Sequence, residues 1–192
     1  MAVEIRVLKK EDDRSSFSCG DIALDYFFQK YAGQNQFKHY IGTTYVAVEK
    51  GELLGFVSVS SGSLARDGLP QGIRKKLPCY PLPVLKITRI GVDRRFQNHG
   101  IGRRLLEAMF RLSLKQKEMS GCVGVVVDAK VEAVAFYEKL GFIVLDVKHG
   151  LSKNYPEQVA MFLVIGSIEK ALHKRHDNLA GMNYQDMTGK DE

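Results

Sequence analysis

A β-strand, a glycine-rich turn and an amphipathic helix follow one another between residues 84 and 127, and this succession constrains the fold most strongly. The run VLKITRIGV (84–92) is rich in β-branched residues, and apolar residues then recur at helical spacing from Ile101 to Leu112. The run CVGVVV (122–127) has the continuous apolar character of a strand covered on both faces. A strand, a crossover helix and a second strand in this order form a right-handed parallel unit.

Further β-rich runs lie on both sides of this unit. They are VEIRVL (3–8), TTYVAVEKGELLGFVSVSS (43–61) with a hairpin turn at Lys50 and Gly51, GFIVLDV (141–147) and VAMFLVIG (159–166). Hairpin strands are antiparallel, so the sheet is predicted to combine antiparallel pairs with one parallel pair. The fold class is therefore α/β (mixed α+β), with one mixed sheet.

Two more helices and a long loop complete the pattern. Asp21 is a cap residue before a helix that the apolar spacing carries to about Gly33. The run VEAVAFYEKL (131–140) predicts a helix that Gly141 ends. Three prolines and a cluster of positive charges between residues 62 and 82 predict a basic loop with room for a short helix only.

The composition is that of one globular domain. The 192 residues are 45% hydrophobic and 26% charged, which argues against a disordered or fibrous chain. No apolar stretch approaches the roughly 18 residues of a membrane span, and the start of the sequence lacks a signal-peptide pattern. The three cysteines lie far apart without a CxxC pair, which favours reduced thiols. We therefore expect a soluble, cytoplasmic protein.

The C-terminal part is expected to differ from the main domain. Residues 1–166 are predicted to form the domain, and residues 167–192 a helix that begins near Ser167 and a flexible tail without periodicity. His173 and His176 lie three residues apart, but no third ligand is nearby. We expect no metal site.

The positive charge is concentrated in one block. Between Lys86 and Lys117 there are nine Lys or Arg residues against Asp93 and Glu107, a net charge of +7, whereas the whole chain carries +6. Such a run forms either a solvated helix face or a surface for a polyanion.

The segment QNHGIG (97–102) lies where the predicted strand gives way to the helix. Helix N-termini bind anions through unpaired N–H groups, and Gly100 and Gly102 would let a phosphate approach the backbone. A plain helix start is the alternative interpretation. The chain has neither GxxxxGK[ST] nor a GxGxxG after its first strand, so a P-loop and a Rossmann site are excluded.

Two segments carry a resemblance to a known family. ITRIGVDRRFQNHGIGRRLL (87–106), followed about thirty residues later by AFYEKLGF (135–142), resembles the acetyl-CoA-binding half of the GNAT superfamily of N-acyltransferases. The resemblance implies a single GNAT-like domain, with a largely antiparallel twisted sheet, a splayed parallel strand pair and flanking helices. It also implies acetyl-CoA as co-substrate, without a metal.

The resemblance assigns roles to individual residues. Tyr137 is the expected catalytic residue, near the thioester sulfur. The chain departs from the family pattern at Lys130, where many members have asparagine. The residues expected to bind acetyl-CoA are Ile90, Gly91 and Val92 on the strand, Gln97, Asn98, His99, Gly100, Ile101, Gly102 and Arg103 in the pyrophosphate loop and helix start, and Ala133 and Phe136 beside the tyrosine.

A narrower resemblance covers residues 3–165. Together with the hairpin and the basic loop, FSCGDIALDYFFQKYAGQN (17–35) and VDAKVEAVAFYEKLGF (127–142) are similar to acetyltransferase toxins of toxin–antitoxin pairs. This implies aminoacyl-tRNA as substrate, through acetylation of its α-amine and a block of translation. A small antitoxin protein and a second copy of the chain are further partners that it allows.

The charged residues also indicate which amine accepts the acetyl group, without use of the family resemblance. An α-amine with a pKa near 7.8 is partly neutral at pH 7, whereas a lysine amine with a pKa of about 10.4 needs a strong base. No carboxylate occurs between Asp67 and Asp93, and His99 lies within the phosphate loop. The acceptor is thus predicted to have a low amine pKa. The candidate tRNA contacts in this stretch are Arg74, Lys75, Lys76, Lys86 and Arg89.

Tyr137 is predicted to stabilise the leaving thiolate rather than to give up its proton. With reference pKa values of about 10 and 8.5, proton transfer from phenol to thiolate is uphill by roughly 2 kcal/mol. The proton of the attacking amine would then end on sulfur. Two alternatives stay open: an acetyltransferase for a small amine or a protein N-terminus, and a non-catalytic acyl-CoA-binding regulatory module.

Overall fold

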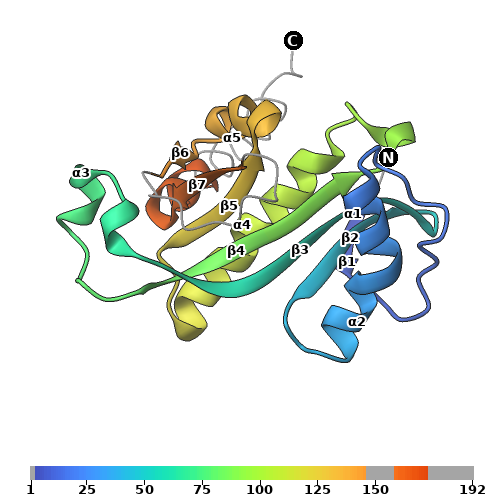
Figure 1. Cartoon of the computed structure of the whole chain (residues 1–192), viewed down its shortest axis with the longest axis horizontal. Coiled ribbons are helices and arrows are strands. Elements are labelled where there is room, and N and C mark those ends of the chain that lie inside the picture. Colours follow the sequence, from blue (N-terminus) through green and yellow to red (C-terminus); the bar gives the residue numbers. More distant parts are fainter. Residues whose placement is uncertain (1–2, 146–157, 173–192) are drawn as a thin grey trace, which may run out of the picture.

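The computed structural model describes residues 3–145 and 158–172, and a seven-stranded sheet runs through it (Figure 1). The strand order is β1-β2-β3-β4-β5-β7-β6, and every neighbouring pair is antiparallel except β4 and β5. The predicted mixed sheet is confirmed. The strands are β1 (Glu4–Val7), β2 (Thr43–Glu49), β3 (Glu52–Leu64), β4 (Leu82–Val92), β5 (Gly124–Lys130), β6 (Ile143–Val144) and β7 (Gln158–Val164).

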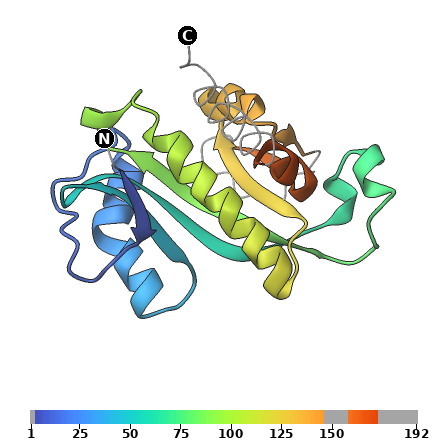
Figure 2. The ribbon, with the colours of Figure 1, turned by 180° about the vertical axis from the view of Figure 1, so that it is seen from behind.

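Helices cover both faces of the sheet. Figures 1 and 2 show α1 and α2 on one face and the long α4 on the other. A π-helical turn, Phe27–Tyr31, joins α1 to α2, and residues 165–172 are also helical. The helices are α1 (Ile22–Tyr26), α2 (Ala32–Phe37), α3 (Gln71–Arg74), α4 (Ile101–Ser120) and α5 (Val134–Lys139).

The alternation of side chains along each strand separates the cores of the two faces. On the α4 face, Leu105 and Met109 are buried against residues of β3, β4, β5 and β7. On the opposite face, the ring of Phe28 from the π-helical turn stacks on Phe56 of β3, with centroids 4.2 Å apart. A further cluster on that face joins Val84 and Val126 to the segment before β4.

The parallel pair opens into a wedge. β4 and β5 are in register from Leu85–Val125 to Ile87–Val127, and beyond that point they no longer pair, although β4 continues to Val92. The wedge vertex, defined here as the Ile87–Val127 pair, therefore lies in mid-strand. This is the splayed pair that the family resemblance implies.

Several local predictions are confirmed. Lys50 and Gly51 both have positive φ, as a tight hairpin turn between twisted strands requires. Asp21 caps α1 by accepting hydrogen bonds from the Ala23 and Leu24 N–H groups. Gly141, with φ of 90°, ends α5.

Other boundaries were wrong. The N-terminal helical segment does not end near Gly33 but continues to Phe37, because Phe37 packs against the core under β2 and Gly33 has no positive φ. β3 extends to Leu64, into the predicted basic loop, whereas the short helix for which that loop was expected to have room is present as α3. The last helix begins at residue 165, close to the predicted start near Ser167. The predicted tail, with His173 and His176, lies outside the described residues.

Within residues 3–145 and 158–172, no helix is long and apolar enough to cross a membrane. The same part of the chain contains no cluster of acidic, histidine or cysteine side chains arranged to hold a metal ion. Its cysteines are free: Cys122 is buried, Cys19 is half-buried and Cys79 is exposed.

Candidate active site

The turn between β4 and α4 is built around Asp93. The Asp93 N–H donates to the carbonyl of Leu54, and its buried carboxylate accepts hydrogen bonds from the backbone N–H and guanidinium of Arg95. Burial alone would raise the pKa of Asp93, but the hydrogen bonds from Arg95 and from the Ser18 N–H outweigh it and lower the pKa below its usual value. The turn is therefore anchored in the sheet by an ionised carboxylate.

The segment QNHGIG then forms a loop with an open helix start. Asn98 and Gly100 both have positive φ, and α4 begins at Ile101 without a capping side chain among the described residues. Backbone turns of this kind point successive N–H groups outward and form concave anion sites at the positive end of the helix dipole. The loop thus has the geometry that a phosphate group needs.

The two glycines of this loop differ. Gly100 has φ of 77°, which favours glycine, and an added Cβ would meet nothing within 4 Å. Gly102 is helical, and its Cβ would meet only Val92 Cγ2 at 3.6 Å, an ordinary contact. Packing within the described protein does not require a glycine at 102. Close approach of a ligand to the backbone would require one.

The side chains of this loop are already engaged. The Gln97 amide donates to the carbonyls of Cys19 (2.8 Å) and Val92 (3.1 Å). His99 Nδ1 lies 2.7 Å from the Gln97 carbonyl oxygen, so this nitrogen carries the proton. Arg103 Nε donates to Glu107 at 3.2 Å. Gln97 and His99 can therefore contribute to an anion site through the backbone rather than through these engaged atoms.

Residues 18–21 connect the loop to the far side of the wedge. Ser18 accepts a hydrogen bond from the Arg94 N–H, and Asp21 forms an ion pair with Lys130 at the end of β5. The asparagine position of the family is thus occupied by a lysine whose partner comes from the cap of α1. Burial raises the pKa of Cys19 to about 11, and the contact with Asp25 adds to the shift, so this thiol stays protonated.

The wedge strand itself is tightly packed on the α1 side. A Cβ on Gly91 would lie 2.9 Å from the Phe56 ring and 3.3 Å from Cys19 Sγ. Ile90 and Val92, on either side of it, are half-buried against the α4 core. The strand can therefore present backbone groups to a ligand in the wedge.

Tyr137 lies on α5 in the core of the α4 face. Its exposed fraction is 4%, and its ring meets Phe136 and Phe142 edge to face, with both centroid distances 5.3 Å. Within the described chain, its hydroxyl has no hydrogen-bond partner. Burial raises its pKa to about 12. Phe136 is 42% exposed, and Ala133 is half-buried.

The predicted tRNA contacts come from elements on the face opposite α4. The Arg89 guanidinium lies over the Phe27 ring, 3.9 Å from its centroid. The segment with Arg74, Lys75 and Lys76 packs on this face through neighbouring apolar residues, Ile73 and Leu77 among them. The arginines of α4 lie on the other face, so the fold divides the basic block of the sequence between two surfaces.

The face opposite α4 carries a carboxylate beside Lys86, although none occurs between Asp67 and Asp93 in the sequence. Asp128, from β5, forms a salt bridge with Lys86 of β4, with Oδ2 and Nζ 2.8 Å apart. No acidic residue lies between Asp67 and Asp93, but the parallel neighbour strand supplies Asp128. The alternation along VVVDAK places Val126 and Asp128 on one face of β5, and this signal could have identified Asp128.

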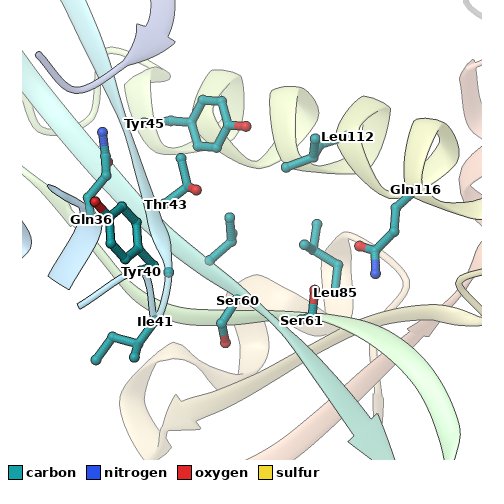
Figure 3. Close-up of a pocket in the computed structure, with 12 residues that line it drawn as sticks. Gln36, Tyr40, Ile41, Thr43, Tyr45, Ser60, Ser61, Leu85, Leu112 and Gln116 are labelled. Atoms are coloured by element: carbon teal, nitrogen blue, oxygen red, sulfur yellow. The ribbon is translucent and has the colours of Figure 1, made fainter. Parts of the chain in front are cut away.

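A cavity lies between the sheet and α4, at a distance from the QNHGIG loop (Figure 3). It has a volume of about 550 Å³ and is lined by Tyr45 of β2, Ser60 and Ser61 of β3, and Leu112 and Gln116 of α4. Gln116 is fourteen residues beyond Gly102, about 21 Å along the helix axis. This end of the cavity therefore lies well away from the QNHGIG loop, although the cavity also reaches Leu85, two residues before the vertex residue Ile87.

Comparison with known proteins identifies the class. The Acetyltransferase (GNAT) domain family matches residues 41–144, and a tRNA-acetylating toxin of Mycobacterium tuberculosis is 33% identical over 140 residues, which cover 71% of this chain and 82% of the toxin. The chain belongs to the GNAT acetyltransferase family. It is an acetyl-CoA-dependent N-acetyltransferase.

Among solved structures, the chain is similar to toxins of this family. AtaT complexed with acetyl-methionyl-tRNAfMet is 26% identical, with a TM-score of 0.75 over 89% of this chain and 99% of that chain. A mutant of the AtaT toxin, bound to the C-terminus of the antitoxin AtaR and to acetyl-CoA, shares the fold at 22% identity, with a TM-score of 0.69 over 88% and 98% of the two chains.

Proposed function

We propose that this acetyltransferase modifies the α-amine of aminoacyl-tRNA and so blocks translation in the cytoplasm. The observation that carries the proposal is the basic face opposite α4, where Arg89 and Lys86 lie along β4 and the α3 segment packs nearby. Phosphates are attracted to such a face. The similar toxin of Mycobacterium tuberculosis acts on tRNA, which agrees with this substrate.

Acetyl-CoA, when bound, supplies an activated acyl group and a thiolate leaving group. We assign its pyrophosphate to the N–H groups of the QNHGIG loop, with Arg103 close by, and its pantetheine arm to the wedge beside Ile90, Gly91 and Val92. The open helix start and the lack of a packing reason for glycine at 102 support this assignment. Ala133 and Phe136 line the same channel in this proposal.

Tyr137 acts as a hydrogen-bond donor in this scheme. With a pKa of about 12, its phenol is protonated throughout the physiological range. Proton transfer to a thiolate with a pKa of about 8.5 would be uphill by about 5 kcal/mol, more than a reference tyrosine implies. The hydroxyl therefore stabilises the developing negative charge on sulfur, and the proton that sulfur finally receives comes from the amine.

The partner proteins follow from the same function. An enzyme that blocks translation must be restrained in its own cell, and AtaT, which shares this fold, binds the C-terminus of an antitoxin. We propose that a small antitoxin restrains this chain too. We also propose a second copy of the chain as a partner.

The test is incubation with labelled acetyl-CoA and a mixture of charged tRNAs, followed by identification of the labelled species. We expect N-acetyl-aminoacyl-tRNA as the main product. The Tyr137→Phe variant should bind acetyl-CoA normally but turn over about 100-fold more slowly, because it keeps the ring and loses the donor. Label on small amines or protein N-termini, with none on charged tRNA, would contradict the proposal.

A further inference from the structure

Asp128 occupies a distinctive place in the wedge. It is the first residue of β5 beyond the vertex pair Ile87–Val127, and it lies on the face opposite α4 with Val126. Its side chain is 32% exposed, and that of its partner Lys86 is 41% exposed. The pair is therefore accessible from the side where the basic residues lie.

The other carboxylates near this part of the face are more fully engaged. Asp21 accepts hydrogen bonds from two N–H groups of α1 and pairs with Lys130. Asp25 accepts hydrogen bonds from the Ser18 hydroxyl and the Cys19 N–H. Asp128 contacts Lys86 through Oδ2, and Oδ1 has no hydrogen-bond partner within residues 3–145 and 158–172. Asp128 thus offers an open acceptor atom.

Asp128 lies where the proposed arrangement of acetyl-CoA would bring the reacting nitrogen. From Val92, beside the QNHGIG loop, to Ile87 at the vertex, β4 rises by five residue steps, about 16 Å. If the pyrophosphate of acetyl-CoA binds at the loop, its pantetheine arm runs along the wedge and its acetyl group lies toward the vertex. An amine that arrives from the basic face then meets the acyl carbon beside Asp128.

We propose that Asp128 accepts a hydrogen bond from the attacking α-amine and stabilises the positive charge that develops on its nitrogen, while Lys86 holds the carboxylate in position. This inference rests on the proposed acetylation of aminoacyl-tRNA. The amine attacks in its neutral form: the N–C bond forms, the C–S bond breaks, and one amine proton ends on the thiolate sulfur. The nitrogen carries positive charge only as the bond forms, so the carboxylate favours the transition state over the ground state.

The first test is Asp128→Asn, assayed with acetyl-CoA and charged tRNA. We expect kcat to fall at least tenfold, with the KM for acetyl-CoA and the melting temperature unchanged, because the amide is isosteric and neutral. Asp128→Glu should restore part of kcat. The matched control is Asp67→Asn, which changes net charge equally at an exposed position before α3 and should keep wild-type kcat.

The Lys86→Met variant distinguishes a role of Asp128 in catalysis from a purely structural role of the Asp128–Lys86 ion pair, which joins β5 to β4. It keeps the carboxylate, so kcat should fall much less than in Asp128→Asn, while the KM for charged tRNA rises. Equal losses of kcat and of melting temperature in both variants would overturn the proposal, and so would wild-type kcat in Asp128→Asn. In either case the proposed function stands if the wild-type enzyme acetylates charged tRNA in the same assay. A wild-type enzyme without that activity would overturn both.

Discussion

At the residue scale, the two glycines of the QNHGIG loop are needed for different reasons, one for the backbone conformation and the other, in our proposal, for ligand binding. Gly100 is needed by the backbone, whereas Gly102 is helical and has room for a side chain. Alanine is the better helix former, and an added methyl group would point toward the space that a phosphate needs. We expect Gly102→Ala to raise the free energy of unfolding by about 0.5 kcal/mol and to weaken acetyl-CoA binding at least tenfold.

Denaturant unfolding and calorimetric titration with acetyl-CoA measure the two effects. Gly100→Ala is the comparison variant, and it should lose about 1 kcal/mol of stability because its φ is positive. If Gly102→Ala bound acetyl-CoA with wild-type affinity, the loop would be a plain helix start, the alternative that the sequence left open.

At the element scale, the start of α1 connects two parts of the site. Asp21 caps the helix and pairs with Lys130 on β5. Asp21→Ala removes both interactions and should cost about 1 kcal/mol, mostly through the lost cap, since Lys130 is well exposed. Asp21→Ser retains a capping oxygen and should cost less than half as much.

Chemical denaturation of both variants tests this division. Equal losses would show that the ion pair, not the cap, dominates. The Asp21→Ser variant lacks the ion pair with Lys130. Its affinity for acetyl-CoA therefore shows separately whether this link between residues 18–21 and β5 is needed for binding in the wedge.

At the scale of the whole molecule, the fold places positive charge on both faces of the sheet. Lys86 and Arg89, which flank the wedge vertex on β4, lie on the face opposite α4. We expect Lys75→Glu with Lys76→Glu to weaken tRNA acetylation by raising the KM for tRNA, with the KM for acetyl-CoA unchanged. The dependence of log affinity on log salt should become shallower by about 1 for each phosphate that the variant no longer binds.

Lys9→Glu with Lys10→Glu, just after β1, is the matched control with the same charge change. Measuring tRNA affinity at several salt concentrations distinguishes a local contact from general attraction. Identical weakening in the two double variants would argue against a contact at the α3 segment.

The sequence predicted those parts of the site that depend on local patterns. The strand, the glycine turn and the helix from 84 to 120 follow from periodicity and backbone conformation, and Gly141 ends α5 as expected. Boundaries that depend on packing were harder. The helix continues past Gly33 because Phe37 packs against the core. The pattern of neighbouring residues does not reveal this contact.

The sequence by itself thus determined the family, the order of elements and the two motifs of the cofactor half, because each is encoded in a short run of residues. Only the tertiary structure decided that Asp128 meets Lys86, that Asp21 reaches Lys130, and that the basic block divides between two faces. These pairings join residues 42 and 109 positions apart in the chain. Their proximity comes from strand order and from the face on which each side chain lies, and both are properties of the assembled sheet.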